Sequence, residues 1–190
     1  PYVLGGELIR GEWFGRYTDL PKYVRRAVFA DTAMKTGEAN DYTVFIDAAL
    51  GRDGRVYIIN LWRKKVDAVG LLPLARDVWA STNGNAQAMY IEDKASGTGL
   101  IQQLQAQAQF VPVIPVQRTI DKLTRVMEVQ PRIQSGGVLI PDYAPWVVDF
   151  IAECEAFTAN DTHKHDDQVD PLCDAVNTFM GGRFDLASLI

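Results

Sequence analysis

The chain has 190 residues, 47% of them hydrophobic and 23% charged, with a formal net charge of −5 at pH 7. This composition excludes a disordered chain and suits one domain with a sizeable core. No apolar run is long enough to cross a bilayer, so no membrane partner is expected, and the acidic balance argues mildly against a broad nucleic-acid-binding surface. Cys154 and Cys173 do not form a CxxC pair, which predicts two free thiols.

The first third of the chain predicts an antiparallel meander. Residues 1–24 are expected to be an irregular lead-in. Strands are predicted over residues 25–33, 42–50 and 56–64, because these runs are rich in apolar, β-branched and aromatic residues. An Asp-Gly pair between the last two is a hairpin signal.

After this meander, helical and extended patterns alternate. Three antiparallel strands followed by this alternation predict an α/β protein with a mixed central sheet flanked by helices, which is the element order of the ribonuclease H-like fold. Strands are predicted over residues 88–93, 111–116 and 136–141, and helices over 66–81, 97–109, 120–133 and 144–157, with a last helix that starts between 167 and 170.

Acidic residues fall where three of these elements meet. Asp31 lies near the end of the first strand, and Glu92 and Asp93 end the fourth. In a mixed sheet of this order these two strands are parallel neighbours, so their carboxyl ends open on the same rim. Carboxylates crowded there repel one another unless a cation intervenes, and hard cations such as Mg²⁺ or Mn²⁺ prefer oxygen ligands. Two such ions would hold a phosphodiester, activate a water and stabilise the leaving oxygen.

The third group of acids opens the last helix. Asp166, Asp167 and Asp170 are the candidates, and Asp170 shares a helix face with either of the other two. Asp174 lies one turn further along and is expected to be solvated. Each acid alone also has an ordinary structural explanation, as a turn former or as a charge that favours the positive end of a helix dipole.

Basic residues near these acids are candidates for contacts with DNA phosphates. Arg118, Lys122 and Arg125 recur at helical spacing, which predicts either a DNA-binding face or a solvated one. Lys94 follows the acids of the fourth strand, where it could contact the scissile phosphate or pair with Asp93.

Several motifs resemble the C-terminal nuclease domain of phage terminase large subunits, the motors that cut and package viral DNA. The resemblance covers most of the chain, and its most specific part is "IEDKASG" followed by "HDDQVD" in this order. The motifs are "FADTAMKTGEANDYTV" (29–44), "YIEDKASGTGLIQQL" (90–104), "TIDKLTRV" (119–126), "GGVLIP" with "APWVVDF", and "HDDQVD" (165–170).

The resemblance implies a ribonuclease H-like fold and a metal-dependent DNA endonuclease that uses Mg²⁺ or Mn²⁺. The first acid of the family corresponds to Asp31 and the second to Glu92, with Asp93 as the adjacent alternative. The third corresponds to Asp167, to which Asp170 and Asp166 could each add a ligand. His165 is a candidate for a supporting role, and the role of Asp41 is open. The implied catalytic residues are Asp31, Glu92, Asp167 and Asp170, and the implied metal ligands add Asp93 and Asp166.

One departure from a complete terminase large subunit is plain. The GxxxxGK[ST] phosphate loop of its ATPase domain does not occur, and the chain opens on Pro1, so a single nuclease domain over residues 1–190 is expected. The implied partners are double-stranded DNA, the terminase small subunit, the ATPase domain and the portal, and the implied location is the host cytoplasm.

Three other functions fit parts of the pattern. A Holliday-junction resolvase or transposase-like enzyme would use the same acids. A nucleotide-binding actin-like domain needs a glycine-rich turn directly after Asp31, whereas the first glycine comes only at Gly37. A non-catalytic DNA clamp of the motor would not need acids on three separate elements.

Overall fold

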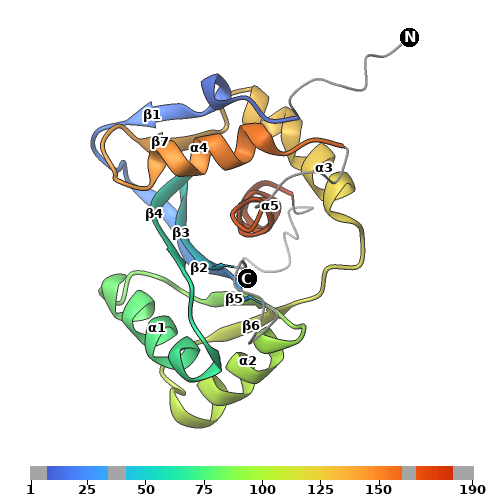
Figure 1. Cartoon of the computed structure of the whole chain (residues 1–190). Helices are drawn as coiled ribbons and strands as arrows, with labels where there is room; N and C mark the ends of the chain where they lie inside the picture. The colour runs from blue at the N-terminus through green and yellow to red at the C-terminus, as the bar shows by residue number, and fades with distance from the viewer. Residues whose placement is uncertain (1–7, 34–41, 160–165, 182–190) are drawn as a thin grey trace.

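The computed structural model describes residues 8–33, 42–159 and 166–181. A seven-stranded mixed sheet, with strand order β1-β7-β4-β3-β2-β5-β6, runs through the molecule and carries helices on both faces (Figure 1). This is the α/β architecture that the order of elements in the sequence predicts.

The middle of the sheet is the predicted meander. Strands β2 (Tyr23–Asp31), β3 (Thr43–Gly51) and β4 (Val56–Lys64) pair antiparallel in chain order. The turn before β4 contains Gly54 with a φ of 78°, a left-handed conformation that glycine adopts at little cost. The boundaries agree with the sequence prediction to within two residues, because each strand is a dense apolar run bounded by turn residues.

The remaining strands add in parallel to both sides of the meander. Strand β5 (Met89–Glu92) pairs with β2, and β6 (Val113–Val116) pairs with β5. Strand β7 (Val138–Pro141) pairs with β4. The predicted parallel neighbourhood of the first and fourth strands is therefore confirmed, and their carboxyl ends lie on one rim.

Part of the expected irregular lead-in is ordered, and that expectation was wrong for residues 11–17. A 3₁₀ helix η1 (Gly11–Trp13) leads into the short strand β1 (Gly15–Tyr17), which pairs in parallel with β7 through Gly15 and Leu139. A three-residue strand shows no alternation long enough to detect. Its stability comes from a partner strand that lies far along the chain.

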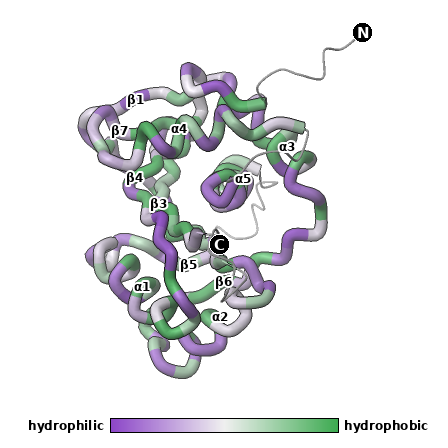
Figure 2. The backbone as a smooth tube through the Cα atoms, in the orientation of Figure 1, coloured by the Kyte–Doolittle hydropathy of each residue, from purple (hydrophilic) through white to green (hydrophobic). Residues whose placement is uncertain are grey.

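The five α-helices of the described chain cover the sheet and divide its apolar residues into two core clusters. One cluster lies between the sheet and α1 and α2, and the other between the sheet and α3, α4 and α5. Strand β2 contributes to both, since Val28 faces the first and Phe29 the second. Figure 2 shows hydrophobic stretches in the central strands and in the helices beside them. The helices are α1 (Ala68–Ser81), α2 (Ser96–Gln107), α3 (Lys122–Gln134), α4 (Val147–Ala156) and α5 (Val169–Met180).

Helix α5 is the most enclosed helix of the described chain. It lies against β2, β3 and β4 and is flanked by α3 and α4 (Figure 1). Eight of its twelve residues are buried, Asp170 among them. Cys154 and Cys173 are free and buried, as predicted, and burial raises the pKa of both thiols. Across the described residues, no helix has both the length and the apolar character needed to span a bilayer.

Candidate active site at the carboxyl rim of the sheet

Four carboxylates from three elements meet at the carboxyl rim, and we call them the acid cluster. Asp31 ends β2, Glu92 ends β5, and Asp170 and Asp174 lie one turn apart on α5. The parallel pairing of β2 with β5 brings the first two together. The packing of α5 across β2 and β3 brings the other two to the same place.

A single arginine lies at the centre of the acid cluster. The Nη1 atom of Arg118 is 3.0 Å from Asp31 Oδ2, 2.9 Å from Glu92 Oε2 and 3.6 Å from Asp170 Oδ2. Its Nη2 atom donates a hydrogen bond of 2.7 Å to Asp174 Oδ2. The arginine side chain is only 5% exposed, so these charges interact with little solvent screening.

Two further cations neutralise the outer side of the same group. Lys122 Nζ lies 2.7 Å from Asp166 Oδ2 and 3.1 Å from Asp170 Oδ2. Arg125 Nη2 donates to Asp170 Oδ1. Asp170 therefore contacts three cations, which explains why a carboxylate can be buried at the first turn of α5.

The protonation of the acids follows from their surroundings. Burial raises the pKa of Asp31 to about 7, and the negative charges of Asp170 and Glu92 add to this rise while Arg118 opposes it. Burial also raises the pKa of Asp174 against the effect of Arg118. Burial acts on Asp170 in the same direction, but Lys122, Arg118 and Arg125 outweigh it and lower the pKa. The cluster thus holds more negative charge than its local cations fully compensate.

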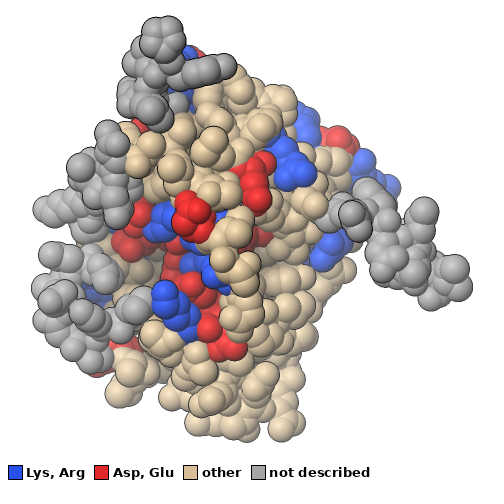
Figure 3. Space-filling model, turned by 90° about the vertical axis from the view of Figure 1, so that its right-hand side faces the viewer, with Lys and Arg blue, Asp and Glu red and all other residues tan. Residues whose placement is uncertain are grey.

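The acid cluster opens into a cavity of about 590 Å³. Asp31, Glu92 and Asp170 line it, together with Asp166 and Asp167 from the segment that leads into α5. Figure 3 shows acidic and basic side chains interleaved over the middle of one face of the molecule. The cavity is open to solvent and rich in carboxylate oxygens, which suits a charged substrate.

The donor set of this cavity fits a hard divalent cation. Mg²⁺ and Mn²⁺ take oxygen ligands, and the carboxylates of Asp31, Glu92, Asp167 and Asp170 can supply them. The point where these oxygens converge already attracts a cation, since Arg118 lies there. With that arginine in place, no three or more His, Cys, Asp or Glu side chains in the described parts of the chain form a group that could hold a metal ion.

The ends of β2 and β5 are held in register by the start of α2. Ser96 Oγ donates to Ala33 O at 2.6 Å and lies 2.7 Å from Thr32 Oγ1. A Cβ on Gly97 would overlap the carbonyl oxygen of Glu92. Only glycine therefore lets α2 approach the strand end so closely, and this contact fixes the backbone that carries Glu92.

The start of α5 is held by a buried glutamate on α4 that sequence reasoning missed. Glu153 accepts hydrogen bonds of 2.6 Å from both the backbone N–H and the side-chain Nε2 of Gln168, and Arg63 lies 3.4 Å from the same carboxylate. Glu153 is next to Cys154 on the buried face of its helix. A charged residue on an apolar face is the signal that could have revealed this buried partnership.

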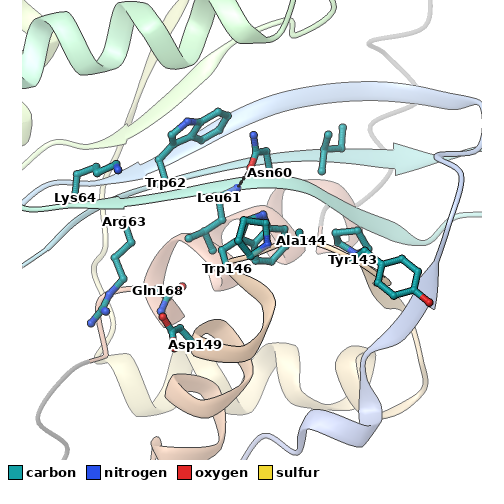
Figure 4. A pocket seen from close by; sticks show the side chains of 13 residues that line it. Asn60, Leu61, Trp62, Arg63, Lys64, Tyr143, Ala144, Trp146, Asp149 and Gln168 are labelled. Atoms are coloured by element: carbon teal, nitrogen blue, oxygen red, sulfur yellow. Dashed lines mark hydrogen bonds between the residues drawn. The ribbon is translucent and has the colours of Figure 1, made fainter.

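A second pocket, of about 670 Å³, lies next to the candidate active site (Figure 4). It is formed by the outer half of β4, which β7 does not pair, and by the segment between β7 and α4. Trp62, Tyr143 and Trp146 contribute aromatic rings, and Gln168 closes it on the side of α5. Among its described lining residues Asp149 is the one acid, so we assign no chemistry to this pocket.

The structure places the other predicted site residues in different surroundings. Asp93 turns away from the cavity, since its carboxylate accepts from Thr98 Oγ1 at 2.7 Å and from Gln117 Nε2 at 3.0 Å. Lys94 is exposed and lines the cavity. Asp41 and His165 lie outside the described residues. None of these positions tests a catalytic role, and the roles stay predictions.

Two expectations about the surface were wrong. Asp174 was expected to be solvated, yet its side chain is 11% exposed and pairs with Arg118. Arg118 was expected to share a helical face with Lys122 and Arg125, but α3 begins only at Lys122. The spacing rule fails for Arg118 because the segment after β6 is not helical. All three cations turn inward to the acids and do not form a solvated face.

Several solved structures share this fold. A large terminase from a thermophilic bacteriophage, solved as the whole subunit, aligns with a TM-score of 0.67 and 15% identity over 96% of this chain and 47% of that one. The nuclease domain of the Thermus phage P74-26 large terminase gives 0.67 and 16% over 94% and 98%. The large terminase nuclease of thermophilic phage G20c with bound zinc gives 0.62 and 19% over 90% and 98%. The present chain thus spans less than half the length of the first of these proteins.

The fold and the acids at its rim define a ribonuclease H-like domain. The family model of the terminase RNase H-like domain matches residues 28–179, which include most of β2, all of β5 and nearly all of α5. The chain belongs to this family, and the resemblance seen in the sequence motifs is confirmed. No curated protein sequence matches it.

Proposed function

We propose that this chain is the nuclease domain of a viral terminase large subunit and that it cleaves concatemeric double-stranded DNA during genome packaging, with Mg²⁺ or Mn²⁺ as cofactor. One observation supports this most strongly. Carboxylates from β2, β5 and α5 lie within 3.6 Å of a single cationic nitrogen, that of Arg118 Nη1. A site built from three separate elements for a cation is what phosphodiester hydrolysis requires.

Asp31, Glu92, Asp167 and Asp170 are the proposed metal ligands, with Asp166 as an additional donor. When bound there, two divalent cations would polarise the phosphodiester, help a water to attack and neutralise the leaving oxygen. The chain's own residues hold these carboxylates at fixed positions on rigid elements. Lys94, exposed at the cavity, is placed to contact a DNA phosphate.

Arg118, Lys122 and Arg125 add the positive charge without which a polyanion would not approach so many acids. In this structure their charged groups contact carboxylates, so we assign them to the inside of the cavity and not to an outer DNA-binding face. None of the described elements around the site is suited to reading base edges, and cutting with little sequence preference is expected. The family match favours this function over a resolvase or transposase-like enzyme.

The proposal is tested by replacing Asp31 with Asn and measuring cleavage of plasmid DNA in Mg²⁺, in Mn²⁺ and in chelator. The wild type should cut only with a divalent ion. Asp31→Asn should be slower by about two orders of magnitude or more, since a lost ligand removes several kcal/mol of transition-state stabilisation. Full activity of this variant would contradict the proposal.

Two neighbouring variants give a matched control. Glu92→Gln should lose activity to the same extent, whereas Asp93→Asn should keep most of it, because Asp93 accepts hydrogen bonds from Thr98 and Gln117. The reverse result would move the ligand from residue 92 to residue 93. By the same family relationship we propose the ATPase domain, the small subunit and the portal as partners, and the host cytoplasm as the location.

A further inference from the structure

The position of Arg118 has a consequence for how the site takes up its cation. Its Nη1 atom lies between Asp31 and Glu92, at 3.0 and 2.9 Å, where the proposed ligands converge. An arginine and a divalent ion cannot occupy the same point. The arginine must therefore leave these two carboxylates for the site to be loaded.

The second nitrogen of the same guanidinium has a separate partner. Arg118 Nη2 is held by Asp174 Oδ2 at 2.7 Å, one helical turn further along α5 from Asp170. Asp174 does not line the cavity. It is thus an anchor beside the site, on which the guanidinium could remain after Nη1 has withdrawn.

We propose that Arg118 is an internal counter-ion that stands in for the divalent cation between Asp31 and Glu92, and that Asp174 is a positioning residue which retains the displaced arginine. This inference rests on the proposed function. Before loading, Arg118 offsets the repulsion between acids that come from different elements and keeps them close together. During loading, it moves its charge from Asp31 and Glu92 towards Asp174, so the carboxylates never face one another unneutralised.

The two residues should affect metal affinity in opposite directions. Arg118→Gln removes the competitor, so Mn²⁺ should bind about tenfold tighter or more, since displacement of the arginine no longer reduces the apparent affinity. Asp174→Asn removes the anchor and should weaken Mn²⁺ binding. In the double variant the second effect should vanish, because Asp174 acts through Arg118.

The measurement is a titration with Mn²⁺ alone, followed by electron paramagnetic resonance of the free ion. Lys122→Gln is the matched control, because it removes one positive charge from the same cavity without touching Asp31 or Glu92. Equal tightening by Lys122→Gln and Arg118→Gln would show a simple charge effect and overturn the proposal. Persistence of the Asp174→Asn effect in the double variant would overturn the role of Asp174.

A wild-type measurement covers the case in which Arg118→Gln does not fold. In ¹⁵N spectra of arginine side chains, the Arg118 signal should shift when Mg²⁺ saturates the protein, and an unchanged signal would overturn the proposal. Wild-type protein that binds Mn²⁺ and fails these tests leaves the proposed function intact. Wild-type protein that binds no Mn²⁺ overturns the proposed function and this inference together.

Discussion

At the scale of single residues, the site is a balance between buried carboxylates and a few cations. Asp31 has the least favourable position, because burial and the charges of Glu92 and Asp170 outweigh the one arginine beside it. Its side chain is 19% exposed, so water relieves this only in part. Without a divalent ion, this carboxyl should keep a proton up to about pH 7.

This raised pKa predicts how stability depends on pH in chelator. Folded protein binds a proton at Asp31 up to about pH 7, whereas the unfolded chain releases it near its ordinary value of about 4. The free energy of unfolding should therefore fall as the pH rises from about 4 to 7, by about 1 kcal/mol per pH unit from this group. Urea denaturation of the wild type and of Asp31→Asn, at several pH values with chelator, measures it.

The contribution of Asp31 is the difference between the two proteins. The stability of Asp31→Asn relative to the wild type should increase between about pH 4 and pH 7 and level off above, because the variant has no proton to lose there. A difference that is constant over this range would show that Asp31 keeps an ordinary pKa.

At the scale of elements, the close contact of α2 with the end of β5 sets the position of Glu92. The space for a side chain at Gly97 is already filled by the Glu92 carbonyl, whereas Gly99, two residues on, meets nothing within 4 Å. The two glycines thus lie in the same helix and differ only in what surrounds them.

Replacing each glycine with alanine separates these roles. Gly97→Ala should destabilise the fold by about 1–3 kcal/mol, as overpacking does, and should slow cleavage by moving Glu92. Gly99→Ala should stabilise it by about 0.5–1 kcal/mol, because alanine is the better helix former. Thermal unfolding and the plasmid assay read both effects. Equal behaviour of the two variants would mean that α2 does not constrain the strand end.

The sequence predicts the long elements well and the short or distant ones poorly. The strands β2, β3 and β4 and the helix α1 have full periodic patterns of their own, so local signals suffice. Strand β1 has three residues and depends on β7, which no local pattern reveals. Helical spacing at Arg118 misled because spacing alone does not show where a helix begins.

At the scale of the whole molecule, the mixed sheet brings together residues that are far apart in the chain. The parallel pairing of β2 with β5 and the placement of α5 across the meander bring Asp31, Glu92 and Asp170 together. Element order and motif order predict this meeting. They do not predict the partners that make it tolerable, such as Arg118 with Asp174, because a buried ion pair depends on the final orientation of side chains.

The central claim is that Asp31, Glu92 and the acids before and within α5 form one divalent-cation site. Anomalous diffraction from crystals soaked in Mn²⁺ tests it most directly. The account predicts one or two strong peaks within coordinating distance of Asp31, Glu92 and at least one of Asp166, Asp167 and Asp170, with Arg118 Nη1 withdrawn from Asp31. Peaks only elsewhere on the surface, or none at saturating Mn²⁺, would contradict it.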